Sequence, residues 1–169
     1  MKGALTNVKT ASNKKSLKKE LFTRGLASIK GARNMRKDMN YTVVIEGNFW
    51  GRNKTFPSWN DVLASYGRKP QIGNRTKQEM QMMCVNAIRR QLNIEIDKPI
   101  KLTYTFYEPD RKRDLGNLLF VDKIFEDAMQ VCGVIKNDNQ NFVKGITANE
   151  VVIDKLNPRV EVEIEEIDE

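Results

Sequence analysis

Residues 99–108 alternate between apolar and polar side chains and are followed at once by a proline, the pattern of a β-strand with one buried face. In an extended chain every second side chain points to the same side, so this segment has one apolar face. The residues on that face are Ile100, Leu102, Tyr104 and Phe106. The pattern predicts a strand in a sheet, and Pro109 ends it.

Three other segments show strand patterns, and two show helical periodicity. The expected strands are residues 41–47, residues 142–154 (one or two strands, broken near Ala148 and Asn149) and residues 159–167. The expected helices are residues 76–92, where Thr76 and Glu79 fit a capping box, and residues 115–132, which Gly133 ends. Residues 48–75, punctuated by Gly and Pro, are expected to form a loop. The order β-loop-α-β-α-β-β predicts an α+β fold, a small mixed β-sheet packed with two helices.

The positive charge of the chain is concentrated at its beginning. Residues 1–40 hold eleven basic and two acidic groups, a net charge of +9, whereas residues 41–169 hold 18 basic and 20 acidic groups. We therefore expect a basic arm, residues 1–40, which becomes ordered on binding, and one folded domain, residues 41–169. A polycation on a near-neutral domain suggests contact with nucleic acid, although a solubilising tail or a ribosome-binding or membrane-surface segment has the same charge pattern.

Composition excludes several kinds of chemistry. The chain has no histidine, which removes histidine-based triads, histidine-ligated zinc and the usual general base. Cys84 and Cys132 lie in separate helical patterns and are expected to be buried free thiols in a reducing compartment. No apolar run reaches the length of a membrane span, and the first residues lack the apolar core of a secretory signal. We therefore expect a cytoplasmic protein without a membrane partner.

A basic run and an acid adjoin just before the second expected helix. Arg111, Lys112 and Arg113 precede Asp114, and another acid, Asp138, lies in a polar turn after that helix. Guanidinium and ammonium groups bind phosphate and carboxylates bind Mg²⁺, a combination that hydrolyses phosphodiesters. Each feature also has a structural explanation: a solvated basic turn, a helix N-cap at Asp114 and an ordinary turn residue at Asp138.

The second expected helix carries further acids. Asp122 and Glu126 are one turn apart and carry like charge, an arrangement that a nearby cation would relieve. Asp122 also lies at the edge of the apolar face, and a buried carboxylate needs a partner. The alternative is a solvated face on which Lys123 pairs with Asp127. The candidate metal ligands are Asp114, Asp122 and Asp138, with Asp110, Glu126 and Asp127 behind them.

These segments resemble the RusA family of Holliday-junction resolvases, which is common in phages and prophages. The resemblance covers about residues 41–167 and rests on short motifs that occur in the family's order. They are Arg111-Lys112-Arg113, Asp114-Leu115-Gly116-Asn117-Leu118, Lys123, Asp127-Ala128-Met129, Gly133, and Asp138 with Gln140. The resemblance implies a Mg²⁺-dependent homodimer that resolves four-way junctions and other branched DNA by paired nicks, in recombination and repair.

The resemblance also assigns roles to residues. Asp114 and Asp138 would carry the family's catalytic, metal-binding carboxylates, and Lys123 would assist at the phosphate. Gly116 stands where the family usually has an acid, and the segment before Lys123 is about one helical turn longer than in the best-known members. Asp122, within that extra turn, is our candidate for the missing catalytic carboxylate.

The expected DNA contacts are Arg111, Lys112, Arg113, Asn117, Arg52 and Lys54. Trp50 and Trp59 lie in the same long segment as the last two, where they would either stack on bases or pin the loop to the core. Two other functions fit the sequence. If the missing acid at Gly116 has disabled the site, the protein binds branched DNA without cutting it. If the acids serve only as helix caps and turn residues, the protein is a structural or ribosome-associated one.

Overall fold

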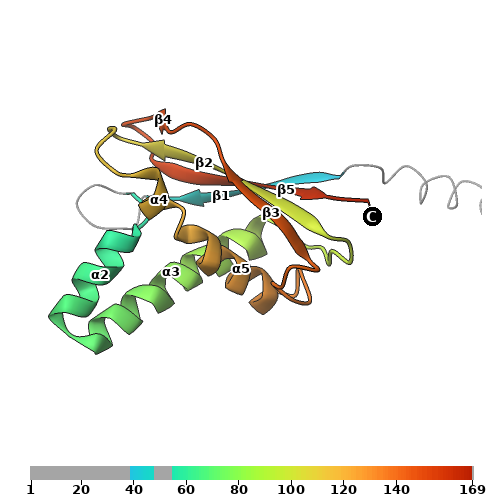
Figure 1. Cartoon of the computed structure of the whole chain (residues 1–169), viewed down its shortest axis with the longest axis horizontal. Helices are drawn as coiled ribbons and strands as arrows, with labels where there is room; N and C mark the ends of the chain where they lie inside the picture. Colours follow the sequence, from blue (N-terminus) through green and yellow to red (C-terminus); the bar gives the residue numbers. More distant parts are fainter. Residues whose placement is uncertain (1–38, 48–54, 169) are drawn as a thin grey trace, which may run out of the picture. The chain divides into compact units, whose positions relative to one another are not determined.

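The computed structural model of this chain describes residues 39–47 and 55–168 (Figure 1). Nearly all of the expected basic arm lies outside the described residues, as do Trp50, Arg52 and Lys54. The boundary expected after residue 40 therefore stays a prediction. The described residues form a mixed sheet of five strands with three helices and one short helical turn, so the predicted α+β class is confirmed.

The strands follow the predicted segments closely. They are β1 (Asn40–Glu46), β2 (Ile100–Glu108), β3 (Val143–Ala148), β4 (Val152–Ile153) and β5 (Arg159–Glu166). Their order is β1-β5-β2-β3, and β4 also pairs with β2. β5 is antiparallel to both β1 and β2, whereas β3 and β4 are parallel to β2. The predicted break near Ala148 separates β3 from β4.

One face of the sheet forms the core, and the helices cover that face (Figure 1). The register places Val43, Val162 and Tyr104 in one row across three strands, each with no exposed surface. Ile45 and Phe106 flank Val160 in the next row. The apolar face predicted for residues 99–108 is therefore buried in the centre of the domain, as the period-two pattern requires.

The segment expected as a loop contains a helix. α2 (Trp59–Arg68) begins where the Asp61 carboxylate accepts the backbone N–H of Ser58 at 2.8 Å. α3 (Pro70–Gln91) begins six residues before Thr76, because proline fits the first turn of a helix, where its missing N–H has no partner to lose. Thr76 is therefore buried inside α3 and donates to the Ile72 carbonyl at 3.0 Å, so the expected capping box is wrong.

The helix expected over residues 115–132 is divided. α4 (Leu115–Leu118) and α5 (Val121–Val131) are separated by Leu119 and Phe120. The N–H of Asp122 bonds to the Leu119 carbonyl at 3.0 Å, a 3₁₀-type bond that interrupts the α-helical pattern. Gly133, with φ of 70°, ends α5 as predicted.

The helices also bear on two expectations from composition. None of the helices between residues 59 and 131 has the length and apolar character that a bilayer crossing requires. Cys84 and Cys132 are free thiols; Cys84 is buried, whereas Cys132 is partly exposed.

Trp59 packs on Phe120 with ring centroids 4.6 Å apart, so this tryptophan connects α2 to the segment between α4 and α5.

We expect Gly73→Ala to destabilise the pairing of α2 and α3. A methyl group on Gly73 would lie 2.3 Å from the Tyr66 ring, so the ring must move, at a cost of about 1–3 kcal/mol in the free energy of unfolding. Gly67→Ala is the matched control, because its methyl group meets no atom within 4 Å. It should raise the free energy of unfolding by about 0.5 kcal/mol, since alanine favours the helix over glycine. Urea unfolding measures both, and equal stability of the two variants would contradict the close contact.

Candidate acidic site

Several of the predicted site residues meet around one ammonium group. Lys123, on α5, pairs with Asp127 at 3.1 Å and with Asp138, which lies in the turn after α5. We call Asp122, Glu126, Asp127 and Asp138, together with Lys123, the acidic cluster. The hydrogen bond from Lys123 lowers the pKa of Asp138, and the same bond raises the pKa of Lys123, so both groups stay charged at neutral pH.

Asp122 is attached to the sheet through a buried tyrosine. The hydroxyl of Tyr104, from the centre of β2, donates to Oδ1 of Asp122 at 3.1 Å. Asp122 is half-buried, and this burial raises its pKa although Tyr104 and Lys123 act in the opposite direction. The partial burial predicted from its place on the helix is confirmed. The sequence pattern placed Tyr104 in the core but did not indicate that its hydroxyl would need a partner there.

Glu126, one of the secondary candidates for a metal ligand, is more buried than the alternative of a solvated helix face would leave it. Only 7% of its surface is exposed, and within the described residues its carboxylate has no hydrogen bond or ion pair. The carboxylate oxygens reach solvent, because no enclosed side-chain oxygen in that part of the chain lacks a partner. Its pKa is raised to about 7, chiefly by burial and also by the charges of Asp122, Asp138 and Asp127, against the opposing effect of Lys123. A carboxylate that is both buried and surrounded by like charge is unfavourable when ionised.

Asp114 lies in a different hollow. This hollow has a volume of about 260 Å³ and is lined by Thr55, Ser58, Asn60, Asp61, Lys112, Arg113, Asp114 and Asn117. The backbone carbonyl of Asp114 accepts the N–H groups of Asn117 and Leu118. Its carboxylate makes no capping bond and, among the described residues, accepts only the Asn117 side chain, at 3.3 Å. The side chain is therefore not used to cap the helix.

The three expected metal ligands are thus only partly brought together. Lys123 bonds to Asp138 and follows Asp122 directly, while Asp114 borders the neighbouring hollow. Across residues 39–47 and 55–168, no three acid or cysteine side chains converge closely enough to hold an ion as they stand.

A second hollow opens beside the acidic cluster. Its volume is about 430 Å³ and it is lined by Trp59, Gly116, Leu119, Phe120, Asp122 and Lys123. A side chain at Gly116 would meet no atom within 4 Å. An acid at this position would therefore have room, and it would face the hollow that Asp122 and Lys123 line.

The basic run before α4 divides into exposed and buried groups. Arg111 and Lys112 are exposed, and Lys112 pairs with Asp110 at 3.1 Å. Arg113 instead donates to both carboxylate oxygens of the buried Glu108 at 3.0 Å. Its other terminal nitrogen donates to the Phe56 carbonyl at 2.8 Å and lies 3.3 Å from the carboxylate of Asp61. The phosphate contact expected of Arg113 stays a prediction, and the structure adds a role in joining β2 to the start of α2.

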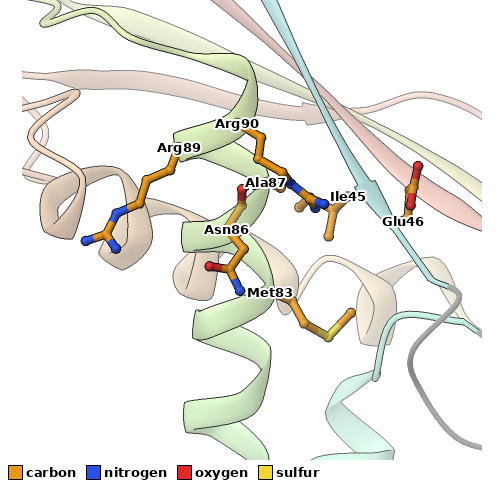
Figure 2. Close-up of a pocket in the computed structure, with 7 residues that line it drawn as sticks. All are labelled: Ile45, Glu46, Met83, Asn86, Ala87, Arg89 and Arg90. Atoms are coloured by element: carbon orange, nitrogen blue, oxygen red, sulfur yellow. Dashed lines mark hydrogen bonds between the residues drawn. The ribbon is translucent and has the colours of Figure 1, made fainter.

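Another hollow, of about 400 Å³, lies between β1 and α3 and contains none of the predicted site residues (Figure 2). Arg90 extends from α3 toward Ile45 and Glu46, whereas Arg89 points away from them. Both arginines lie in the last turn of α3, where cations suit the helix dipole. Because their guanidinium groups diverge, they do not form a pair around one ligand.

No known family model matches the chain, and a search of curated proteins also finds no match.

We expect Arg113→Met to destabilise the protein by about 3 kcal/mol, because it leaves the buried Glu108 carboxylate without its partner. Lys112→Met is the control at the adjacent position, since 85% of the Lys112 side chain is exposed and no measurable change should follow. Urea unfolding at neutral pH makes the comparison. If the two variants have urea unfolding curves with equal midpoints and slopes, Arg113 does not compensate the buried charge of Glu108.

We expect Glu126 to make the folded protein less stable as pH rises. Its pKa is about 7 in the folded state against an ordinary value of 4.5, so folding favours the protonated form and stability declines as pH passes from 4.5 through 7. Glu126→Gln removes this charge. Allowing for solvent screening, its free energy of unfolding should exceed that of the wild type by about 1–2 kcal/mol at pH 8, with a smaller difference at pH 5.

Thermal unfolding in a metal chelator between pH 5 and pH 8 measures this dependence. Glu79→Gln, which alters an exposed pair with Arg75, should show no such pH-dependent gain. A gain of Glu126→Gln over the wild type that does not change with pH would contradict the raised pKa.

Proposed function

We propose that this protein is a Mg²⁺-dependent, structure-selective endodeoxyribonuclease that resolves four-way junctions and other branched DNA by paired nicks. The observation that carries the proposal is the contact between Lys123 and Asp138, 15 residues apart, with Asp122 adjacent at the edge of an open hollow. All three are among the site residues that the sequence predicts. A solvated helix face and an unrelated turn would have no reason to adjoin.

The donor groups fit a divalent cation. Asp122 and Asp138 offer the carboxylate oxygens that Mg²⁺ prefers, and Asp114 borders the neighbouring hollow. When bound, the ion would supply an activated water and neutralise charge on the phosphate, which a chain without histidine needs for this reaction.

The protein's own residues have separate tasks. Lys123 carries a fixed positive charge beside the hollow, where it would hold a phosphate oxygen. Arg111 and Lys112 are exposed and available for flanking phosphates. Tyr104 holds Asp122 from the sheet and restricts its rotation. Asn117 donates to Asp114 and orients that carboxylate.

The substrate and the homodimer follow from the family resemblance. A four-way junction is roughly two-fold symmetric, so a two-fold dimer presents one site to each of two opposed strands. Recognition would then depend on the positions of phosphates more than on base edges. The basic arm of residues 1–40 would add affinity that falls with rising salt.

A branched-DNA-binding protein without catalysis is the second candidate. Two observations favour it: Gly116 supplies no carboxylate where the family has one, and Asp138 is paired with Lys123. The two candidates differ in one measurable property, since only the first cuts the DNA that it binds.

A labelled synthetic four-way junction, incubated with the full chain with and without Mg²⁺, separates the two functions. Paired nicks that need Mg²⁺ support the nuclease, and a shifted band without cutting supports the binding protein. We expect Asp114→Asn and Asp138→Asn to retain junction binding while nicking falls by about 100-fold or more.

Asp97→Asn is the control for these variants, because Asp97 is 72% exposed and pairs with Lys136 outside the acidic cluster. Wild-type nicking by Asp114→Asn or Asp138→Asn would remove that residue from the site. If Asp122→Asn cuts as the wild type does while Asp114→Asn does not, Asp122 is not the replacement for the missing acid.

Gly116→Asp tests the site by adding a group. The new carboxylate has room and faces the hollow lined by Asp122 and Lys123, so we expect Mg²⁺-dependent nicking to rise by about tenfold. Gly116→Asn is the matched variant with the same size and no charge, and it should not exceed the wild type. Equal rates for the two substitutions would contradict a metal site at this hollow.

A further inference from the structure

The hollow of about 430 Å³ beside Lys123 has an aromatic side that its charged groups do not explain. Trp59, the first residue of α2, and Phe120, between α4 and α5, both line this hollow. Their ring centroids lie 4.6 Å apart with the ring planes inclined by 47°, and both side chains are partly exposed. Leu119 adds another apolar group, and the space where Gly116 would carry a side chain is open. A concave aromatic surface that reaches solvent suits a flat, mostly apolar ring.

Two ammonium groups adjoin this aromatic surface. Lys123 lines the hollow while it pairs with Asp127 and Asp138. The Nζ atom of Lys77, on α3, lies 5.8 Å from the centre of the Phe120 ring. Among the described residues no carboxylate pairs with Lys77, so its charge is available to an anion from outside the protein. A ligand that combines a flat ring with negative charge matches this arrangement.

We propose that the hollow binds one unpaired nucleobase of a DNA strand, which stacks on Trp59 and Phe120 while Lys77 contacts a phosphate of the same strand. This inference deepens the proposed function, on which it rests for the identity of the strand. Stacking on aromatic side chains accepts any base, because every base has a π-face.

The proposal supplies a physical reason for a preference for branched DNA. A base can enter the hollow only after it has left its own stack, and this step costs free energy. The cost is lowest where pairing and stacking are already interrupted, as at a branch point. A continuous duplex pays the full cost and is therefore disfavoured at this site.

The location of the aromatic surface agrees with a role in placing the strand. Asp122 and Lys123 line the same hollow, so a base held there brings its neighbouring phosphates near Lys123. The contact between Trp59 and Phe120 also fixes this surface directly before α5, the helix that carries most of the acidic cluster.

The fluorescence of Trp59 tests the subsite without any cutting. The chain has two tryptophans, and Trp50→Phe leaves Trp59 as the only one. In a metal chelator, we expect single-stranded oligothymidylate to quench this emission, whereas an abasic oligomer of equal length and charge should not. The charge of the basic arm acts equally on the two oligomers. Equal quenching by both, or quenching by neither, would overturn the proposal.

Phe120→Leu removes one ring and keeps an apolar group. We expect it to weaken the binding of oligothymidylate by about tenfold and to change the affinity for the abasic oligomer by less than about twofold. Tyr66→Leu is the matched control, because Tyr66 is also a partly buried aromatic residue of α2 but bonds to Asn74 and does not line the hollow. The ratio of the two affinities should keep its wild-type value in this control. An unchanged ratio in Phe120→Leu, or the same fall in both variants, would count against stacking.

A measurement on the unchanged protein decides the matter if Phe120→Leu fails to fold. A four-way junction with 5-iododeoxyuridine at the branch point should crosslink on irradiation to Trp59 or Phe120, which peptide mass spectrometry would locate. The same base placed within an arm should not crosslink to these residues. Crosslinks from the branch point that fall only on other residues would refute the subsite.

The outcome is separable from that of the nuclease proposal. Base-dependent quenching of Trp59 in a protein that never nicks junctions would uphold the subsite and reject the nuclease. Mg²⁺-dependent nicking by a protein that quenches equally with both oligomers would do the reverse.

Discussion

The burial of one face of β2 beneath the helices is the constraint on which the rest of the structure depends. β2 pairs with β5 on one side and with β3 and β4 on the other, so its inward side chains lie at the centre of the core. Tyr104 packs edge-on against Phe125 of α5, with ring centroids 6.2 Å apart. Because its hydroxyl ends at Asp122, the same side chain that anchors the core also positions a carboxylate of the acidic cluster.

Charge compensation divides the polar groups near this core into two kinds. Arg113 bonds to Glu108 and to the Phe56 carbonyl, so it neutralises a buried acid and holds the start of α2. α5 has no comparable arginine. Its acids share one lysine, which bonds to Asp127 and Asp138, and Glu126 has no bonded cation in the described residues. The first arrangement stabilises a fold, while the second stores unfavourable charge, which is characteristic of sites that bind a ligand.

The strands were predictable because alternation with period two is a local property of the chain, and each segment carries it independently. The sequence did not predict α2 because this helix buries only one residue fully, Val62. The glycines and prolines of residues 48–75 also indicated a loop, whereas Pro70 lies in the first turn of α3. The candidate acids were recognised by residue type and order. The burial of Glu126 was not, since on the helix alone it lies among charged neighbours and only the packing of α5 against the rest of the domain encloses it.

The sequence by itself determined the strand faces, the end of α5 at Gly133 and the set of acids and cations available for chemistry, because these depend on neighbours along the chain. Only the tertiary structure decided which charges meet. Arg113 reaches Phe56 across 57 positions and Lys123 reaches Asp138 across 15. Hydrogen bonds and ion pairs act over a few ångströms of space, and separation along the chain does not specify that distance.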